Sequence, residues 1–156
     1  MNQKNESALE LKQAVATEVA RQIQFKIDQL AGEIHALQQD RSGESKSSAG
    51  DKHETGRAMM DLELERLEIQ MMKAKKAMAE LNSVSFGPNS RAEQGALIVT
   101  NRNHFMLAVA LGKVHAMNRD VWVISVVSPM GQAMLHRRPS EVFEVNGTRY
   151  EILSIH

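Results

Sequence analysis

The sequence predicts an α+β protein, in which an antiparallel helical coiled-coil hairpin over residues 1–84 precedes a small antiparallel β domain over residues 85–156. The first observation behind this prediction is the distribution of glycine and proline. Residues 57–86 contain neither, whereas residues 87–156 hold all three prolines and five of the nine glycines. The second is that five of the six aromatic residues fall at or beyond residue 86. Turn-forming residues over 84–89 mark the predicted boundary.

Each arm of the predicted hairpin carries apolar residues at heptad spacing, which is typical of helices that pair along one seam. In the first arm these are Ala16, Val19, Ile23, Ile27, Leu30, Ile34 and Leu37. In the second arm they are Met60, Leu64, Leu67, Met71, Ala74, Met78 and Leu81. Six of the twelve residues over 41–52 are glycine or serine, so we expect the tip loop there, near residues 41–54.

Pairing the two arms in reverse order tests whether they fold back on each other. The residue numbers of each pair add up to 97 or 98, from Leu37 with Met60 to Ala16 with Leu81. A constant sum is expected of two antiparallel helices in register, and it favours a monomeric hairpin about 35 Å long. Two alternatives remain: amphipathic helices packed on a globular core, and arms that pair between chains in a coiled-coil dimeric adapter.

The second half contains short apolar and β-branched runs that predict strands over 96–100, 105–110 and 121–127. Ser128 followed by Pro129 is typical of a helix start, so a short helix is expected over 128–135. The segments 141–145 and 148–155 flank Asn146-Gly147, a strong signal for a β-hairpin.

The segment Gly50-Asp51-Lys52-His53-Glu54 carries two acids one helical turn apart at the expected tip. One interpretation is structural, because Asp followed three residues later by Glu forms a capping box at a helix start. The other is chemical, because two carboxylates at the end of a hairpin can be delivered to a Mg²⁺ ion held elsewhere. The two interpretations are compatible if only one carboxylate caps.

These features together resemble the bacterial Gre transcript-cleavage factors over roughly residues 10–156. Gly50, Asp51 and Glu54 match the Gly-Asp-x-x-Glu motif at the tip of the Gre hairpin. The segment 128–135 and the last predicted hairpin are similar to the FKBP-like C-terminal domain of that family.

The resemblance implies a transcription elongation factor that binds RNA polymerase and inserts its hairpin into the secondary channel. Asp51 and Glu54 would then help to hold a second Mg²⁺ for cleavage of backtracked RNA by two-metal chemistry. The chain would not be an enzyme, would hold no metal or other cofactor on its own, and would approach the RNA 3′ end only indirectly. The candidate partner-binding residues are Ser128, Pro129, Met130, Gly131, Arg137 and Arg138.

The tip also departs from the family pattern. The family usually continues Asn-Ala-Glu-Tyr after the motif, whereas this chain has Thr55-Gly56-Arg57-Ala58, and Lys52 and His53 stand inside the motif. A cation beside the acids weakens Mg²⁺ binding or contacts RNA phosphate instead. The alternative is therefore a secondary-channel regulator of RNA polymerase that does not cleave RNA.

Composition excludes several other classes of function. The chain has no cysteine, so disulfides and thiolate chemistry are absent. Its formal net charge of zero argues against general nucleic-acid binding. No apolar run is long enough to span a membrane and no signal-peptide core follows Met1, so we expect a cytoplasmic protein. The six histidines show no metal-ligand spacing.

Overall fold

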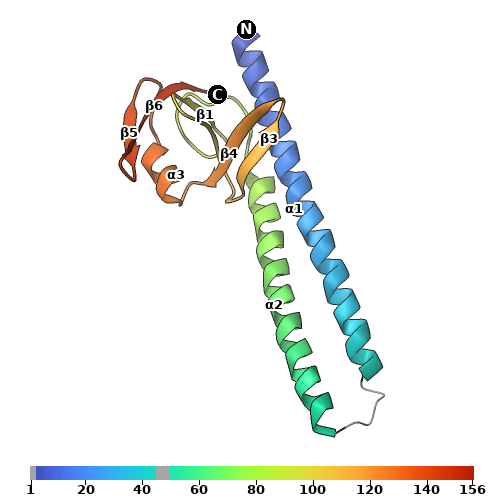
Figure 1. Ribbon diagram of the computed structural model, residues 1–156. Coiled ribbons are helices and arrows are strands. Elements are labelled where there is room, and N and C mark those ends of the chain that lie inside the picture. Colours follow the sequence, from blue (N-terminus) through green and yellow to red (C-terminus); the bar gives the residue numbers. More distant parts are fainter. Residues whose placement is uncertain (1–2, 45–49) are drawn as a thin grey trace. The chain divides into compact units, whose positions relative to one another are not determined.

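The computed structural model describes residues 3–44 and 50–156, with side chains described from Glu6 to Gly43 and from Glu54 onward. Two long helices precede a six-stranded, mostly antiparallel sheet, which confirms the α+β fold class (Figure 1). The chain divides into two compact units. One comprises Met1–Arg21 with Ala79–His156, and the other comprises Gln22–Met78.

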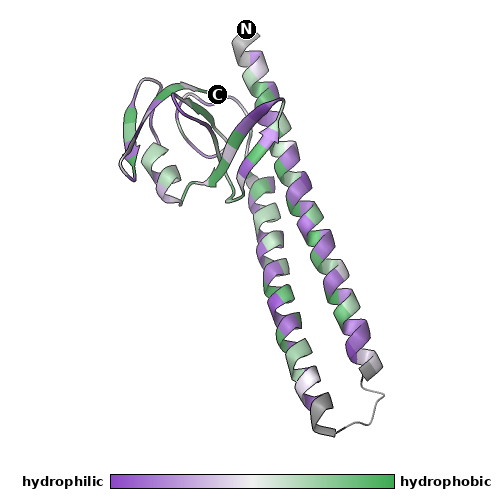
Figure 2. Cartoon of the chain, viewed as in Figure 1, coloured by the Kyte–Doolittle hydropathy of each residue, from purple (hydrophilic) through white to green (hydrophobic). Residues whose placement is uncertain are grey.

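The unit Gln22–Met78 is built from parts of the two helices, α1 (Gln3–Glu44) and α2 (Gly50–Ser83). Both helices show hydrophilic and hydrophobic segments in alternation along their length (Figure 2). Every predicted seam residue within this unit is buried or half-buried, while most other described positions are exposed. Leu30 and Leu67, which face each other in the predicted register, are the most deeply buried, at 1% and 3% exposure. This burial pattern fits a single apolar seam between two antiparallel helices.

Two electrostatic contacts in this unit also fit the antiparallel register. Arg41 of α1 forms an ion pair with Asp61 of α2 at 3.2 Å. Glu33 of α1 lies close enough to Arg66 of α2 to contribute to the raised pKa of that guanidinium, although the hydrogen bond that Arg66 donates to Glu63 is the main cause. The helix α1 continues to Glu44, four residues into the Gly/Ser-rich segment 41–52 in which the composition predicts a loop.

The other unit contains the sheet, whose strand order is β3-β4-β2-β1-β6-β5. The elements are β1 (Leu97–Thr100), β2 (His104–Ala108), β3 (Gly112–Ala116), β4 (Arg119–Ser125), α3 (Pro129–Met134), β5 (Val142–Val145) and β6 (Thr148–Ile155). All the predicted strands and the short helix are present. The turn between β5 and β6 has positive φ at both Asn146 (51°) and Gly147 (75°), as a two-residue hairpin requires.

The sheet differs from the prediction in two respects. Strand β3 was not predicted, and it pairs with β4 through a turn at Met117 and Asn118 in which both residues have positive φ. Strands β2 and β4 are parallel, with Phe105 beside Trp122 in the register. The two differences have one cause, because β3 supplies the return path that lets β4 run in the same direction as β2.

The core of this unit gathers around the aromatic rings of Phe105, Phe143 and Tyr150. The Tyr150 ring stacks on Phe143 at 5.1 Å between centroids and meets Phe105 edge-on at 6.1 Å. Buried residues from β1, β2, α3 and β6 complete this cluster, among them Ile98, Leu107, Met134 and Ile152. Such a cluster stabilises a small sheet by removing apolar surface from water.

One buried charge ties the linker to the first helix in the same unit. The side chain of Lys12 is fully buried, and its ammonium group donates to the Gly87 carbonyl and, at 2.6 Å, to Oδ1 of Asn89. Burial lowers the pKa of Lys12 to about 8, while the nearby carboxylate of Glu93 partly opposes this shift. Lys12 therefore anchors the segment that follows α2, a role that sequence patterns did not reveal.

Candidate functional site at the turn end of the hairpin

The two predicted tip acids belong to the first turns of α2. Because this helix begins at Gly50, Asp51 lies within the helix rather than at the cap position that the capping-box interpretation assigned to it. Glu54 follows one turn later and its side chain is exposed. The side chains of Asp51, Lys52 and His53 lie outside the described part of the chain. The structure thus places the exposed carboxylate of Glu54 near the start of α2, one helical turn from the position of Asp51. This end of the hairpin, where α1 ends and α2 begins, is called the turn end below.

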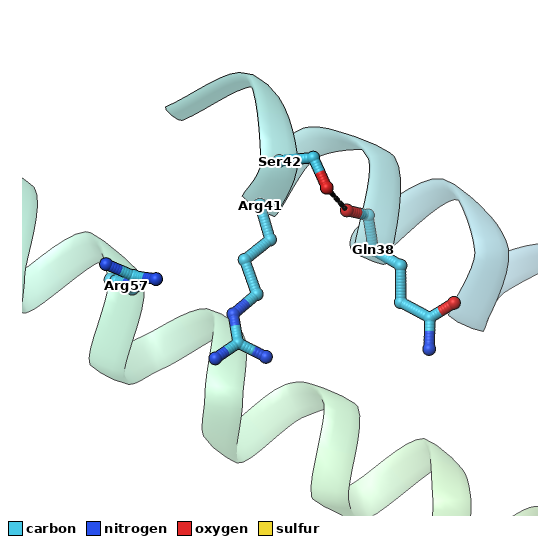
Figure 3. A pocket seen from close by; sticks show the side chains of 4 residues that line it. All are labelled: Gln38, Arg41, Ser42 and Arg57. Carbon is cyan, nitrogen blue, oxygen red and sulfur yellow. Dashed lines mark hydrogen bonds between the residues drawn. The ribbon is translucent and has the colours of Figure 1, made fainter. Parts of the chain in front are cut away.

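Positive charge accompanies these acids at the same end of the hairpin. A cavity of about 280 Å³ is lined by Gln38, Arg41 and Ser42 of α1 and by Arg57 of α2. In Figure 3 the Arg41 side chain extends from α1 toward α2, and Arg57 projects from α2 beside it. The Ser42 hydroxyl donates to the Gln38 carbonyl at 3.0 Å, which holds Ser42 against its own helix.

The two arginines of this cavity differ in their surroundings. The side chain of Arg41 is 41% exposed, and its guanidinium forms the ion pair with Asp61. The side chain of Arg57 is exposed, and its position is one helical turn beyond Glu54. A carboxylate and a guanidinium therefore occupy neighbouring surface positions at the turn end. This arrangement offers oxygen ligands for a hard cation and N–H donors for a phosphate.

Sequence analysis named Arg57 only as a departure from the family motif and did not identify the cavity with Arg41. The available signal was an arginine on each side of the Gly/Ser-rich segment. Two arms in antiparallel register bring residues with a sum near 97 together, and positions 41 and 57 satisfy this condition. The register alone was thus sufficient to place the two arginines together.

The segment Ser128–Gly131, predicted as a partner contact, has a clear structural role. The Ser128 hydroxyl accepts from the Gly131 backbone N–H at 3.0 Å and donates to the Ser125 carbonyl at 2.7 Å, so it caps α3. Pro129 is exposed and Met130 packs at the edge of the aromatic cluster. A Cβ atom on Gly131 would lie 2.2 Å from the Ser125 carbonyl oxygen, so only glycine fits there.

The two candidate arginines after α3 have different environments. Arg137 donates to the Ala133 carbonyl at 2.6 Å, and its guanidinium lies 5.9 Å from the ring centroid of Phe143. These contacts commit most of Arg137 to the fold. The backbone N–H of Arg138 donates to the Glu141 carboxylate, but the Arg138 side chain is exposed. Of the two, Arg138 is the better placed to contact a partner.

Within the described residues, no group of three or more His, Cys, Asp or Glu side chains is arranged to hold a metal ion. The helices among these residues include none that combines the length and the apolar character needed to cross a membrane.

In comparisons with known proteins, this chain is similar to several solved structures. No family model and no curated protein sequence matches the chain. Among solved structures, one of the transcription factor Gfh1 covers 89% of this chain and 94% of its own, with 16% identity and a TM-score of 0.39. A structure of the GreA factor homologue Gfh1 from Thermus thermophilus covers 92% and 95%, with 18% identity and a TM-score of 0.34. Gfh1 from Thermus aquaticus covers 90% and 95%, with 14% identity and a TM-score of 0.34.

Proposed function

We propose that this protein is a Gre-like factor that acts on RNA polymerase from its secondary channel, with the turn end of the hairpin as the working end. The sheet domain would dock on the polymerase, and the hairpin would carry Asp51 and Glu54 toward the polymerase active centre. The observation that carries this proposal is that α1 and α2 bury a shared apolar seam. The acid Glu54 is exposed in the first turns of α2, near the end of this seam.

The donor set at the turn end is chemically suited to Mg²⁺. Carboxylate oxygens are hard ligands, and this ion takes one or two of them from a protein while it keeps several waters. In the polymerase complex the ion would supply a bound, activated water for hydrolysis of the RNA backbone. The role of Glu54 and Asp51 is to position oxygen ligands, which agrees with an exposed site that excludes no water by itself. The catalytic centre would remain that of the polymerase.

The cavity with Arg41 and Arg57 favours a second candidate, a secondary-channel regulator that binds without cleaving. A guanidinium next to Glu54 competes with a metal ion for the carboxylate, and it attracts phosphate oxygens. On this view the hairpin occupies the channel and changes polymerase activity through contacts with nucleic acid or the active-centre loops.

Transcript cleavage on stalled, backtracked polymerase complexes separates these candidates. The wild type is expected to accelerate release of the 3′ RNA fragment, and Asp51→Asn and Glu54→Gln are expected to lower this rate by roughly 10-fold or more, because each removes a charged metal ligand. Glu68→Gln, an exposed acid elsewhere on α2, serves as the matched control and should behave as wild type.

Co-purification with the host polymerase completes the test. Binding with acid-dependent cleavage supports the cleavage factor, while binding without cleavage supports the regulator. In the latter case Arg57→Ala is expected to weaken the effect on transcription and Glu54→Gln to leave it unchanged. A chain that does not bind polymerase would contradict both candidates.

A further inference from the structure

The cavity at the turn end is lined by polar side chains and lies between guanidinium groups of two helices. Its lining residues are Gln38, Arg41, Ser42 and Arg57, and its volume is about 280 Å³. It is smaller than the cavities of about 300–1,000 Å³ that hold drug-sized molecules. None of the four residues is aromatic or aliphatic, so the cavity offers no surface on which a nucleobase or an acyl chain would pack. A ligand of this cavity is therefore expected to be small, polar and negatively charged.

The hydrogen-bond donors of the cavity come from both arms of the hairpin. In Figure 3 the side chains of Gln38 and Arg41 extend from α1 toward α2, and Arg57 projects from α2. The Ser42 hydroxyl uses its proton on the Gln38 carbonyl, so the donors are the two guanidinium groups and the Gln38 amide. A guanidinium is a planar fork that binds two oxygen atoms of a phosphate with parallel hydrogen bonds. The donor set is thus suited to phosphate oxygens.

A carboxylate of the chain itself competes for part of this donor set. Asp61 stands one helical turn after Arg57 and forms its ion pair with Arg41 at 3.2 Å. Both side chains of this pair are more than 40% exposed, and ion pairs between exposed side chains are weak. Among the residues that the structure describes, none forms an ion pair with Arg57. A phosphate that accepts from both guanidinium groups at once therefore gains more than Asp61, which contacts only one.

We propose that this cavity is a phosphate-binding site, in which Arg41 and Arg57 hold one phosphate group from opposite arms of the hairpin. The phosphate replaces the Asp61 carboxylate at Arg41. Such a group can belong to a free oligophosphate or to the backbone of single-stranded RNA. The proposal deepens the regulator described above and rests on it only for the role of the site in the channel. Because binding is measured on the chain alone, failure of this proposal is distinguishable from failure to act on RNA polymerase.

Proton–nitrogen NMR of the full chain, which resolves the Nε–H groups of arginine, measures binding of sodium pyrophosphate and of a short oligouridylate without terminal phosphates. We expect the Nε–H signals of Arg41 and Arg57 to shift, with a dissociation constant for pyrophosphate on the order of 1 mM at low salt. Arg41→Ala and Arg57→Ala are each expected to weaken binding roughly 10-fold, because each removes one of the two forks. Arg66→Ala, an exposed arginine of α2 that does not line the cavity, is the matched control. Far-UV circular dichroism verifies that every variant keeps its helices.

The competition by Asp61 provides a test of opposite sign. Asp61→Asn releases the Arg41 guanidinium, so the affinity for pyrophosphate is expected to rise roughly 3-fold or more. Glu68→Gln removes the same charge from an exposed position of α2 outside the cavity, and salt screens its distant effect. This control should leave the affinity near that of wild type. A gain confined to Asp61→Asn separates competition at Arg41 from a change in net charge, and a purely structural Arg41 would give no gain.

The two ligands distinguish the source of the phosphate. Binding of pyrophosphate alone assigns the site to free oligophosphates, binding of the oligouridylate alone assigns it to the RNA backbone, and binding of both assigns it to phosphate groups of either kind. Three results would overturn the proposal. The first is that neither ligand shifts the arginine signals up to about 20 mM. The second is a loss for Arg66→Ala as large as that for Arg57→Ala, and the third is an Asp61→Asn variant that binds no more tightly than wild type.

Discussion

The hairpin unit and the sheet unit are stabilised in different ways. The hairpin Gln22–Met78 buries a single seam, and most of its remaining described positions are exposed. The sheet unit closes a three-dimensional core around stacked aromatic rings, and a close backbone approach at Gly131 leaves no space for a side chain. A hairpin residue outside the seam can therefore change without loss of packing, whereas most residues around α3 are needed for the fold.

The largest effect on stability is expected at Gly131, where the sheet unit has no space for a side chain. Gly131→Ala would bring a methyl group to 2.2 Å from the Ser125 carbonyl oxygen, so the α3 start must move. We expect a loss of about 3–4 kcal/mol in the free energy of unfolding. Trp122, the single tryptophan, lies in β4 and reports the unfolding of the sheet in urea.

Gly87→Ala is the control for this substitution, since its nearest atom would be an ordinary 3.8 Å away. Its stability should stay within about 0.5 kcal/mol of wild type. Equal losses for the two glycine variants would show that the tight fit at the start of α3 is not what restricts position 131.

A smaller effect is expected at the centre of the hairpin seam. Leu67→Ala removes a nearly fully buried side chain opposite Leu30 and should cost about 2–3 kcal/mol. Leu62→Ala, at an exposed position of the same helix, should change stability by less than about 0.5 kcal/mol at micromolar concentration. Thermal unfolding followed by circular dichroism at 222 nm measures both. Similar losses at both positions would contradict a single seam.

Sequence patterns were sufficient for the features set by local spacing. The heptad seams, the helix start at Ser128 and the hairpin turn at Asn146-Gly147 all follow from residues close together in the chain, and the structure confirms them. The register of the two arms also had enough information to place Arg41 near Arg57, although that step was not taken.

The features that were missed depend on tertiary context. Strand β3 alternates polar and apolar residues over only five positions, and its turn uses Met117 at positive φ, a residue that carries no turn signal. The parallel pairing of β2 with β4 follows from that strand. Lys12 stands between Leu11 and Val15 on the helix. This pattern does not predict that its ammonium group is buried and hydrogen-bonded to a linker far along the chain.

The buried Lys12 gives the sheet unit a pH dependence in the alkaline range. The pKa of Lys12 is lowered from 10.5 to about 8 in the folded protein, so between these values the unfolded chain binds more protons than the folded one. Stability then rises with pH over this range, by about 3 kcal/mol from this group. Well below pH 8 Lys12 is protonated in both states and contributes no slope.

Lys12→Met isolates this contribution from that of the exposed lysines. Urea unfolding at a series of pH values from 8 to 10.5, followed by Trp122 fluorescence, should show a steeper rise in stability for wild type than for the variant. Lys26→Met, an exposed lysine on the same helix, should keep the wild-type slope. Parallel curves for wild type and Lys12→Met would mean that the ammonium of Lys12 is solvated in the folded protein and that this charge does not hold the linker.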